Sequence, residues 1–159
     1  RKLINTLNEY GKVFITTEDR IEREFEKYQL KSKPDEIFSL LYYSELFIGD
    51  SQTMTNEAAV LGTPSLRLNS FVGRISYLEQ QEKKYKLAFG FRPGEFDSLT
   101  SKIKELMSFN NLKEEWQRRR RAMLADKIDV TGFLVDLIDS YPDSIKDIKN
   151  NTDYFEKFK

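Results

Sequence analysis

The sequence contains no cysteine and no histidine. The absence of cysteine excludes a disulfide framework, a thiol nucleophile and a thiolate metal site. The absence of histidine removes the side chain that most often acts as a general base or binds a transition metal. An excess of charge of one sign is also missing, because 26 lysines and arginines balance 26 aspartates and glutamates. Bulk electrostatics therefore indicate neither a nucleic-acid partner nor a membrane surface.

Long hydrophobic runs are absent too. No apolar stretch approaches the length of a transmembrane helix, and no signal peptide is visible. We therefore expect no membrane span and a cytoplasmic location. With 159 residues, 39% of them hydrophobic, the chain is long enough for one domain with its own core. It begins with arginine rather than methionine, which suggests a fragment of a longer protein.

The most informative stretch runs from Leu46 to Leu68. It begins with an apolar run at 46–49 and ends with another at 65–68, and both are short enough to be buried strands. Between them, Asp50 or Ser51 can cap a helix, and Gly62 followed by Pro64 ends it. The side chains expected to face the sheet repeat at helical spacing, at Met54, Ala58 and Leu61. The pattern predicts a βαβ unit in a parallel sheet.

The turn at the start of this helix is a candidate anion site. A helix that begins at the carboxyl end of a parallel strand presents free backbone amides and the positive end of its dipole. Ser51, Gln52 and Thr53 lie where a phosphate would rest, and Glu57 projects from the same side as Thr53. A plainer interpretation also holds at this point, in which Asp50 and Ser51 only cap the helix and Glu57 is solvated.

The rest of the chain alternates strands and helices. Further strands are predicted at 12–17, 29–32 and 87–91, and helices at 1–10, 18–28, 75–84, 95–109, 111–127 and 130–141. One more helix is predicted to begin at Pro34 and to bury Ile37, Leu40 and Leu41. This order predicts an α/β fold with a Rossmann-like, mostly parallel sheet flanked by helices and a helical C-terminal extension. We assign residues 1–109 to the Rossmann-like part and residues 110–159 to C-terminal helices that pack on it. The end of the chain is expected to fray or to pack through its aromatic residues, Tyr154, Phe155 and Phe158.

Loops that follow strands supply the other candidate residues. Asn69 and Arg74 leave the strand at 65–68 and would share the rim of the sheet, although Arg74 is equally well read as a surface arginine. Arg67 is better explained as structural, paired with a carboxylate. A second rim loop is predicted at 16–20, including Glu18, but nothing in its spacing is specific. The basic run at 118–121 fans around most of a helical turn and is expected to be solvated, while the buried residues of its helix are Trp116, Met123 and Leu124.

The segment D-S-Q-T-M-T-N-E-A-A-V-L-G-T-P-S-L-R-L resembles the nucleotide-binding segment in the C-terminal domain of GT-B proteins. The non-hydrolysing UDP-N-acetylglucosamine 2-epimerases carry D-S-G-G-x-x-E-E-A-x-x-x-G-x-P followed by a strand ending in L-R. The residues in register are Asp50, Ser51, Glu57, Ala58, Gly62, Pro64 and Arg67. An uncharacterised bacterial and archaeal family with D-S-x-T-M-x-x-E-A-A-V-L-G-T-P is more similar still. The likeness extends more loosely from about Lys12 to Tyr141.

The resemblance implies half of a GT-B fold that binds a nucleotide-sugar such as a UDP-sugar. The Ser51 turn would hold the pyrophosphate, and Glu57 would accept hydrogen bonds from the ribose. Gln52 stands where the epimerases have glycine. The resemblance also implies a preceding strand and an N-terminal domain, both missing here, that would supply the catalytic acids. No cofactor, metal site or catalytic residue is predicted in this chain.

Two functional interpretations therefore remain. The parent protein is either a UDP-sugar epimerase or glycosyltransferase, or it carries a non-catalytic α/β domain of the same fold that binds a ligand or a partner. This chain alone is not expected to turn over a substrate. A sheet without its first strand is also expected to self-associate, which makes a homo-oligomer one of the expected states.

Overall fold

The computed structural model describes residues 1–17 and 19–159. The N-terminal part holds short elements, α1 (Lys2–Asn8), η1 (Arg23–Tyr28), η2 (Pro34–Glu36) and α2 (Ile37–Tyr43). The central part holds β1 (Phe47–Gly49), α3 (Gln52–Leu61), β2 (Ser65–Leu68), α4 (Ser76–Gln80), η3 (Gln81–Tyr85) and β3 (Ala88–Phe91). The C-terminal part is helical, with α5 (Phe96–Met107), α6 (Leu112–Ala125), α7 (Val130–Asp139), α8 (Asp143–Asn150) and η4 (Tyr154–Phe158).

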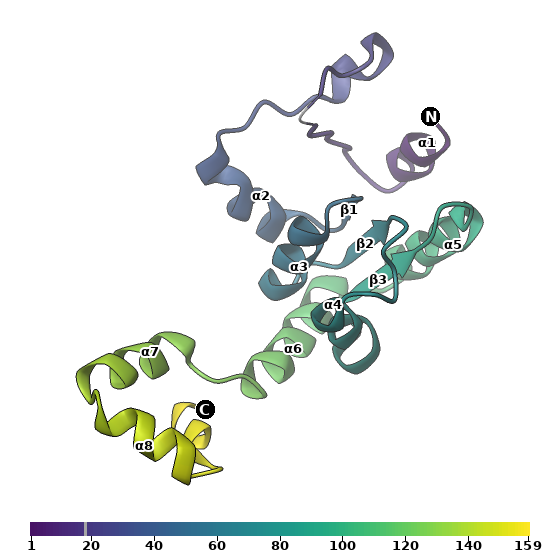
Figure 1. The fold of residues 1–159 in the computed structure, drawn as a ribbon. Coiled ribbons are helices and arrows are strands. Elements are labelled where there is room, and N and C mark those ends of the chain that lie inside the picture. The colour runs from purple at the N-terminus through teal and green to yellow at the C-terminus, as the bar shows by residue number, and fades with distance from the viewer. Residues whose placement is uncertain (18) are drawn as a thin grey trace.

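The sheet is three-stranded and parallel, in the order β1-β2-β3. Helices flank it, so the predicted α/β class and parallel sheet are confirmed (Figure 1). The register aligns Gly49, Arg67 and Gly90 in one row across the three strands. Residues in one row of a sheet project to the same face.

Two predicted strands are wrong. Segments 12–17 and 29–32 meet only in an isolated parallel bridge between Ile15 and Gln29, outside the three-stranded sheet. The β-branched residues there favour extended backbone, but two paired residues without a third strand or a buried face do not make a sheet. The predicted helix at 18–28 is a 3₁₀ helix over Arg23–Tyr28, and Glu18 lies outside the described residues. The described residues of that loop, 16–17 and 19–20, therefore do not belong to the rim of the sheet.

The βαβ unit forms as local chemistry predicts. The Ser51 hydroxyl caps α3 by accepting a hydrogen bond from the Met54 amide, at 3.3 Å. Gly62 ends the helix with a left-handed φ of 77°, a conformation that glycine adopts without steric cost. The expected buried face is shifted, however. Met54 and Leu61 are only half-buried, whereas the fully buried side chains are small ones, Thr55, Ala58 and Ala59.

Small residues on α3 allow the helix backbone to approach the sheet closely. The Thr55 hydroxyl donates to the carbonyl of Ser51 at 2.7 Å, so its polar atom is satisfied inside the helix. The Ser65 hydroxyl of β2 donates to the carbonyl of Thr55 at 3.1 Å. This direct bond from a strand side chain to the helix backbone requires small residues at the interface, and Met54 is only half-buried.

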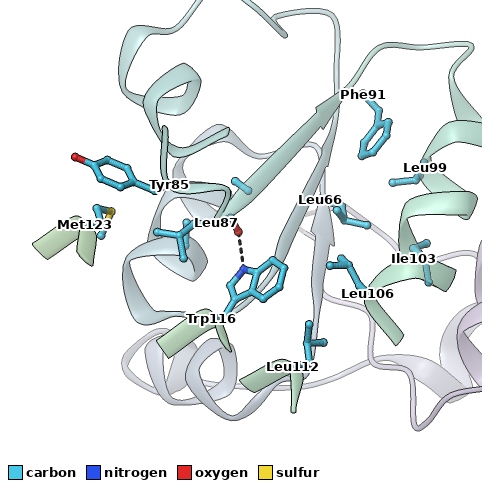
Figure 2. Packing of buried hydrophobic residues seen from close by; sticks show 12 residues of the cluster. Leu66, Tyr85, Leu87, Phe91, Leu99, Ile103, Leu106, Leu112, Trp116 and Met123 are labelled. Atoms are coloured by element: carbon cyan, nitrogen blue, oxygen red, sulfur yellow. Dashed lines mark hydrogen bonds between the residues drawn. The ribbon is translucent and has the colours of Figure 1, made fainter. Parts of the chain in front are cut away.

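The apolar core is built from side chains of β2, β3, α5 and α6, and it also includes Ala59 of α3 and Tyr85 of η3. Leu66 of β2 packs with Leu99, Ile103 and Leu106 of α5 (Figure 2). Trp116 of α6 is buried against the same cluster, and its indole Nε1 donates to the carbonyl of Leu87 at 2.9 Å.

The predicted burial of the α6 side chains is correct for two of three residues. Trp116 and Met123 are buried, but Leu124 is 40% exposed. Consecutive residues of a helix point about 100° apart, so Leu124 cannot share the direction of Met123.

The C-terminal helices form a small cluster beyond α6 (Figure 1). Phe133 of α7 stacks against Tyr154, Phe155 and Phe158, with ring centroids 5.5–6.5 Å apart. Packing of the chain end through its aromatic residues is therefore confirmed. Among the described residues, every helix is too short or too polar to cross a membrane.

Candidate functional site

The carboxyl ends of the three strands are linked by hydrogen bonds from one residue, Asn69. Its Nδ2 donates to the carbonyl of Asp50 at 2.8 Å, which links the end of β2 to the turn after β1. Its Oδ1 accepts from the amide of Phe71 at 3.0 Å, and its backbone amide donates to Phe91 at the end of β3, also at 3.0 Å. These bonds make the rim of the sheet a continuous hydrogen-bonded edge. Asn69 is thus brought next to Asp50, as the predicted site requires.

The turn between β1 and α3 leaves backbone donors free. The Met54 amide bonds to the Ser51 hydroxyl and the Thr55 amide to the Ser51 carbonyl. Within residues 1–17 and 19–159, the amides of Gln52 and Thr53 have no hydrogen-bond partner. Free amides in the first turn of a helix are donors for an anion and lie at the positive end of the dipole.

The other predicted residues surround this turn at different depths. Glu57 is half-buried in the second turn of α3, about 8 Å further along the helix axis than Gln52. Arg74 is exposed, and its backbone amide closes the loop after β2 by donating to Phe71 at 3.1 Å. In the part of the chain that the structure describes, the side chains of Glu57 and Arg74 make no ion pair.

One rim residue was not predicted from the sequence. Arg92 follows β3, and its Nη2 lies 3.7 Å from the position that a Cβ on Gly73 would occupy. Gly73 has a φ of 84°, which permits the loop after β2 to fold over toward Arg92. The only sequence signal was the position of Arg92 directly after a predicted strand.

Arg67 is structural, as predicted, and its environment is unusual. The side chain is fully buried, and its Nη2 donates to Glu82 Oε1 at 2.8 Å. The guanidinium lies over Gly90, since a Cβ on that residue would approach Nη2 to 3.0 Å. Within the described residues, Nε and Nη1 of Arg67 have no partner. Arg67 is therefore buried beneath the rim and is not one of the side chains that a ligand at the rim could reach.

The neighbouring Glu79 of α4 is held ionised by the same part of the fold. A hydrogen bond from Lys83 lowers the pKa of Glu79, and the Gly73 amide and Arg67 lower it further. Across the described ranges, no three carboxylates gather closely enough to hold a metal ion.

The basic run at 118–121 does not form a binding face, but the prediction that it is simply solvated is wrong for two residues. Arg119 Nη1 donates to the carbonyl of Lys86, and Arg120 Nε donates to the carbonyl of Val60, both at 2.7 Å. Gln117 Nε2 donates to Leu61 at 2.9 Å. Carbonyls at the end of a helix lack intrahelical partners, so α6 supplies donors to the end of α3.

The comparison with known proteins assigns a family. Neither the curated proteins nor the solved structures contain a significant match to this chain. Residues 1–86 match the family described as "Protein of unknown function (DUF354)", and these are more than half of the 159 residues. The matched range includes α3 and the rim residues Ser51, Asn69 and Arg74. The chain therefore belongs to the DUF354 family.

Proposed function

We propose that this chain is the nucleotide-sugar-binding half of a GT-B-type epimerase or glycosyltransferase, and that it holds the pyrophosphate of a UDP-sugar at the turn between β1 and α3. The observation that carries the proposal is the pair of free amides at Gln52 and Thr53, next to the Ser51 hydroxyl. A diphosphate offers several acceptor oxygens, and a helix N-terminus offers donors and positive potential. The location at the carboxyl ends of parallel strands is where open α/β sheets bind ligands.

The surrounding side chains have matching roles. Asn69 holds the turn in place through Asp50, and Arg74 is available to pair with a phosphate oxygen. Glu57, further along α3, would accept hydrogen bonds from the ribose hydroxyls. No cofactor is required for binding of this kind.

Catalysis would need groups from another domain. The sequence contains no histidine, and among the described residues no base accompanies Ser51, so acid–base chemistry would come from residues that face the rim across a cleft. The cytoplasm, where nucleotide-sugars are available, is the expected location.

A second candidate is a non-catalytic α/β interaction domain of the same fold whose rim does not bind a ligand, and Gln52 favours it. Its side chain is half-buried at the first position of α3, where the epimerases have glycine. A side chain at this position restricts how closely a phosphate approaches the amides. Gln52→Gly separates the two candidates, because tighter UDP binding in the variant indicates that the native residue blocks the site.

The proposal is tested by titrating the chain with UDP and following its backbone amide resonances. We expect shifts at residues 51–53, at Asn69 and at Arg74. We also expect Glu57→Gln to weaken UDP binding by about 1.5–3 kcal/mol, the range for hydrogen bonds to a charged group, with little change in thermal stability.

The matched control is Glu105→Gln on α5, an exposed carboxylate far from the rim that pairs with Lys102. This variant should leave UDP binding unchanged. Unchanged affinity in Glu57→Gln together with lower stability would make Glu57 structural, and amide shifts confined to residues 118–121 would remove the site from the β1–α3 turn.

A further inference from the structure

The rim carries a second exposed arginine, Arg92, to which the proposed function gives no role. Arg92 is the first residue after β3. Its Nη2 lies 3.7 Å from the point that a Cβ on Gly73 would occupy, so the side chain reaches from the end of β3 to the loop after β2. Because the strand order is β1-β2-β3, this is also the direction of the Ser51 turn. Arg92 therefore leans toward the proposed nucleotide site.

Hydrogen bonds hold the backbone on both sides of this contact. The Arg92 amide donates to Glu95 Oε2 at 2.6 Å, and the Glu95 amide donates to the carbonyl of Arg92 at 3.0 Å. In the facing loop, the Arg74 amide donates to the carbonyl of Phe71 at 3.1 Å, and Gly73 has a φ of 84°. Arg92 and the residue it leans on are therefore presented to each other by two closed turns.

The positive charge at this part of the rim is not neutralised by the protein. Within the described residues, neither Arg74 nor Arg92 has a carboxylate within ion-pair distance of its guanidinium. Arg74 directly follows Gly73, so the contact between the two loops carries two such cations. Clustered charge of one sign raises the local concentration of oppositely charged ligands. The pair therefore favours a ligand with more than one anionic group.

The spacing of the strands places Arg92 beyond the pyrophosphate. Adjacent strands lie about 4.8 Å apart, so the ends of β1 and β3 are separated by about 10 Å. In a nucleotide-sugar, five covalent bonds of about 1.5 Å each lead from the outer phosphorus through the sugar ring to its C6 carbon, a reach of no more than about 7 Å. The side chain of Arg92, which leans toward β2, covers the remaining distance. A group on C6 is therefore within reach of its guanidinium.

We propose that the sugar of the bound nucleotide-sugar is a uronic acid and that its C6 carboxylate pairs with Arg92. The inference rests on the proposed function, because it needs the pyrophosphate at the turn between β1 and α3. A guanidinium offers parallel N–H donors that match the two oxygens of a carboxylate. A neutral hexose would leave this cation unpaired, so Arg92 acts as a specificity-determining residue. Arg74 stays available for a phosphate oxygen.

The test compares UDP-glucuronic acid with UDP-glucose, which differ only in the C6 carboxylate and the C6 hydroxymethyl group. Both are titrated into the chain by calorimetry at low salt, where exposed charges are least screened. We expect UDP-glucuronic acid to bind about tenfold more tightly to the wild-type chain. Arg92→Gln should lose this preference and keep its affinity for UDP-glucose. Arg92→Lys should retain part of it, because the charge remains without the planar fork.

The matched control is Arg121→Gln. Arg121 is an exposed arginine on α6, away from the rim, so this variant removes the same charge and should keep the full preference. A preference that disappears equally in Arg121→Gln would reduce the effect to net charge and overturn the inference.

The remaining outcomes separate the inference from the proposed function. Equal affinity of the wild-type chain for the two ligands, or a preference that survives in Arg92→Gln, would overturn the role of Arg92 and leave nucleotide-sugar binding intact. Failure of the wild-type chain to bind UDP or either UDP-sugar would overturn the proposed function, and the inference with it. The comparison of the two ligands on the wild-type chain needs no variant, so it decides the point even if Arg92→Gln does not fold.

Discussion

At the scale of single residues, Arg67 shows how a buried charge depends on its surroundings. The guanidinium is removed from water and has one carboxylate partner, Glu82, at 2.8 Å. Removing a cation from water costs several kcal/mol, which a single ion pair repays only in part. Gly90 is needed beside it, because a Cβ there would lie 2.8 Å from Glu82 Oε1 and 3.0 Å from Arg67 Nη2. We therefore infer that the ion pair fixes the arrangement of the rim and adds little to the net stability of the fold.

The first prediction concerns this ion pair. Arg67→Met and Glu82→Leu should each destabilise the fold by about 3–5 kcal/mol, because each leaves a buried charge without its partner. The double variant should recover most of the loss, because apolar side chains of similar size fill the space without a desolvation cost. Urea unfolding followed by tryptophan fluorescence measures all three. A loss of unfolding free energy in the double variant equal to the sum of the two single losses would contradict this expectation.

Glu115 yields a prediction about pH. Hydrogen bonds from Arg118 and then Arg119 lower the pKa of Glu115 from 4.5 to about 2. A carboxyl group whose folded pKa is depressed stabilises the protein above its unfolded pKa and loses that contribution as the pH falls through the folded value. Glu115→Gln should therefore be less stable than wild type at pH 7, by about 0.5–1 kcal/mol for a surface pair.

This difference should shrink between pH 4.5 and pH 2 and vanish below. Thermal unfolding of wild type and of Glu115→Gln at several pH values between 7 and 2 measures this difference in stability. The comparison of the two proteins cancels the titration of other carboxylates, such as Asp126, whose pKa is lowered by Lys84. A difference that stays constant from pH 7 to pH 2 would show that the two hydrogen bonds do not contribute.

At the scale of elements, α3 is defined by its two ends. Ser51 supplies the cap at its start, and Gly62 with a φ of 77° ends it. The end is then covered by α6, whose Gln117 and Arg120 donate to the carbonyls of Leu61 and Val60. Gly62 is therefore constrained in two ways, by its left-handed φ and by the side chains of α6 that pack beside it.

Gly62→Ala should destabilise the fold for both reasons. A Cβ at this position would overlap Gln117 Nε2 and lie 2.9 Å from Arg120 Cδ, and a left-handed φ costs an L-residue about 1–2 kcal/mol. We expect a loss of about 2–3 kcal/mol in urea unfolding. Gly11→Ala is the control, because a Cβ there meets nothing within 4 Å, and it should be neutral or slightly stabilising. Equal effects of the two variants would show that neither the φ nor the contact with α6 matters.

At the scale of the whole molecule, the chain exposes more surface than a compact protein. Its accessible surface is 10926 Å², whereas a compact monomer of this mass exposes about 8,300 Å². Part of the excess lies on α7, which has no buried residue. Its exposed apolar side chains are Val130, Leu134, Val135 and Ile138, and three of them, Val130, Leu134 and Ile138, repeat at helical spacing along one stripe. Contiguous exposed apolar surface mediates association.

We therefore expect concentration-dependent self-association through α7. Sedimentation velocity should show a larger species as the concentration rises, and the double variant Leu134→Lys/Ile138→Lys should remain monomeric. Tyr43→Lys, on a side chain that is 81% exposed at the end of α2, is the control and should not change association. If the wild-type chain stays monomeric at the highest concentration tested, α7 does not mediate self-association.

The sequence by itself determined those features that depend on a few neighbouring residues. Ser51, Gly62 and Pro64 act on the backbone beside them, so the ends of α3 and the bounds of β2 were predicted as observed. The alternation of strands with helices in the central part likewise indicated the parallel sheet, because parallel strands require a crossover. The positions of Ser51, Gln52, Thr53 and Asn69 on one rim follow from that sheet alone.

Tertiary structure decided whatever depends on partners far along the chain. Residues 12–17 have strand propensity, but no neighbouring strand completes a sheet there. The donors from Arg119 and Arg120 reach carbonyls 33 and 60 residues away, and the amide pair between Gln81 and Asn56 joins residues 25 apart. These contacts depend on how α6 and η3 pack on α3. Burial and hydrogen bonding are set by which side chains and backbone groups come together in the folded chain, and the local sequence pattern does not specify this.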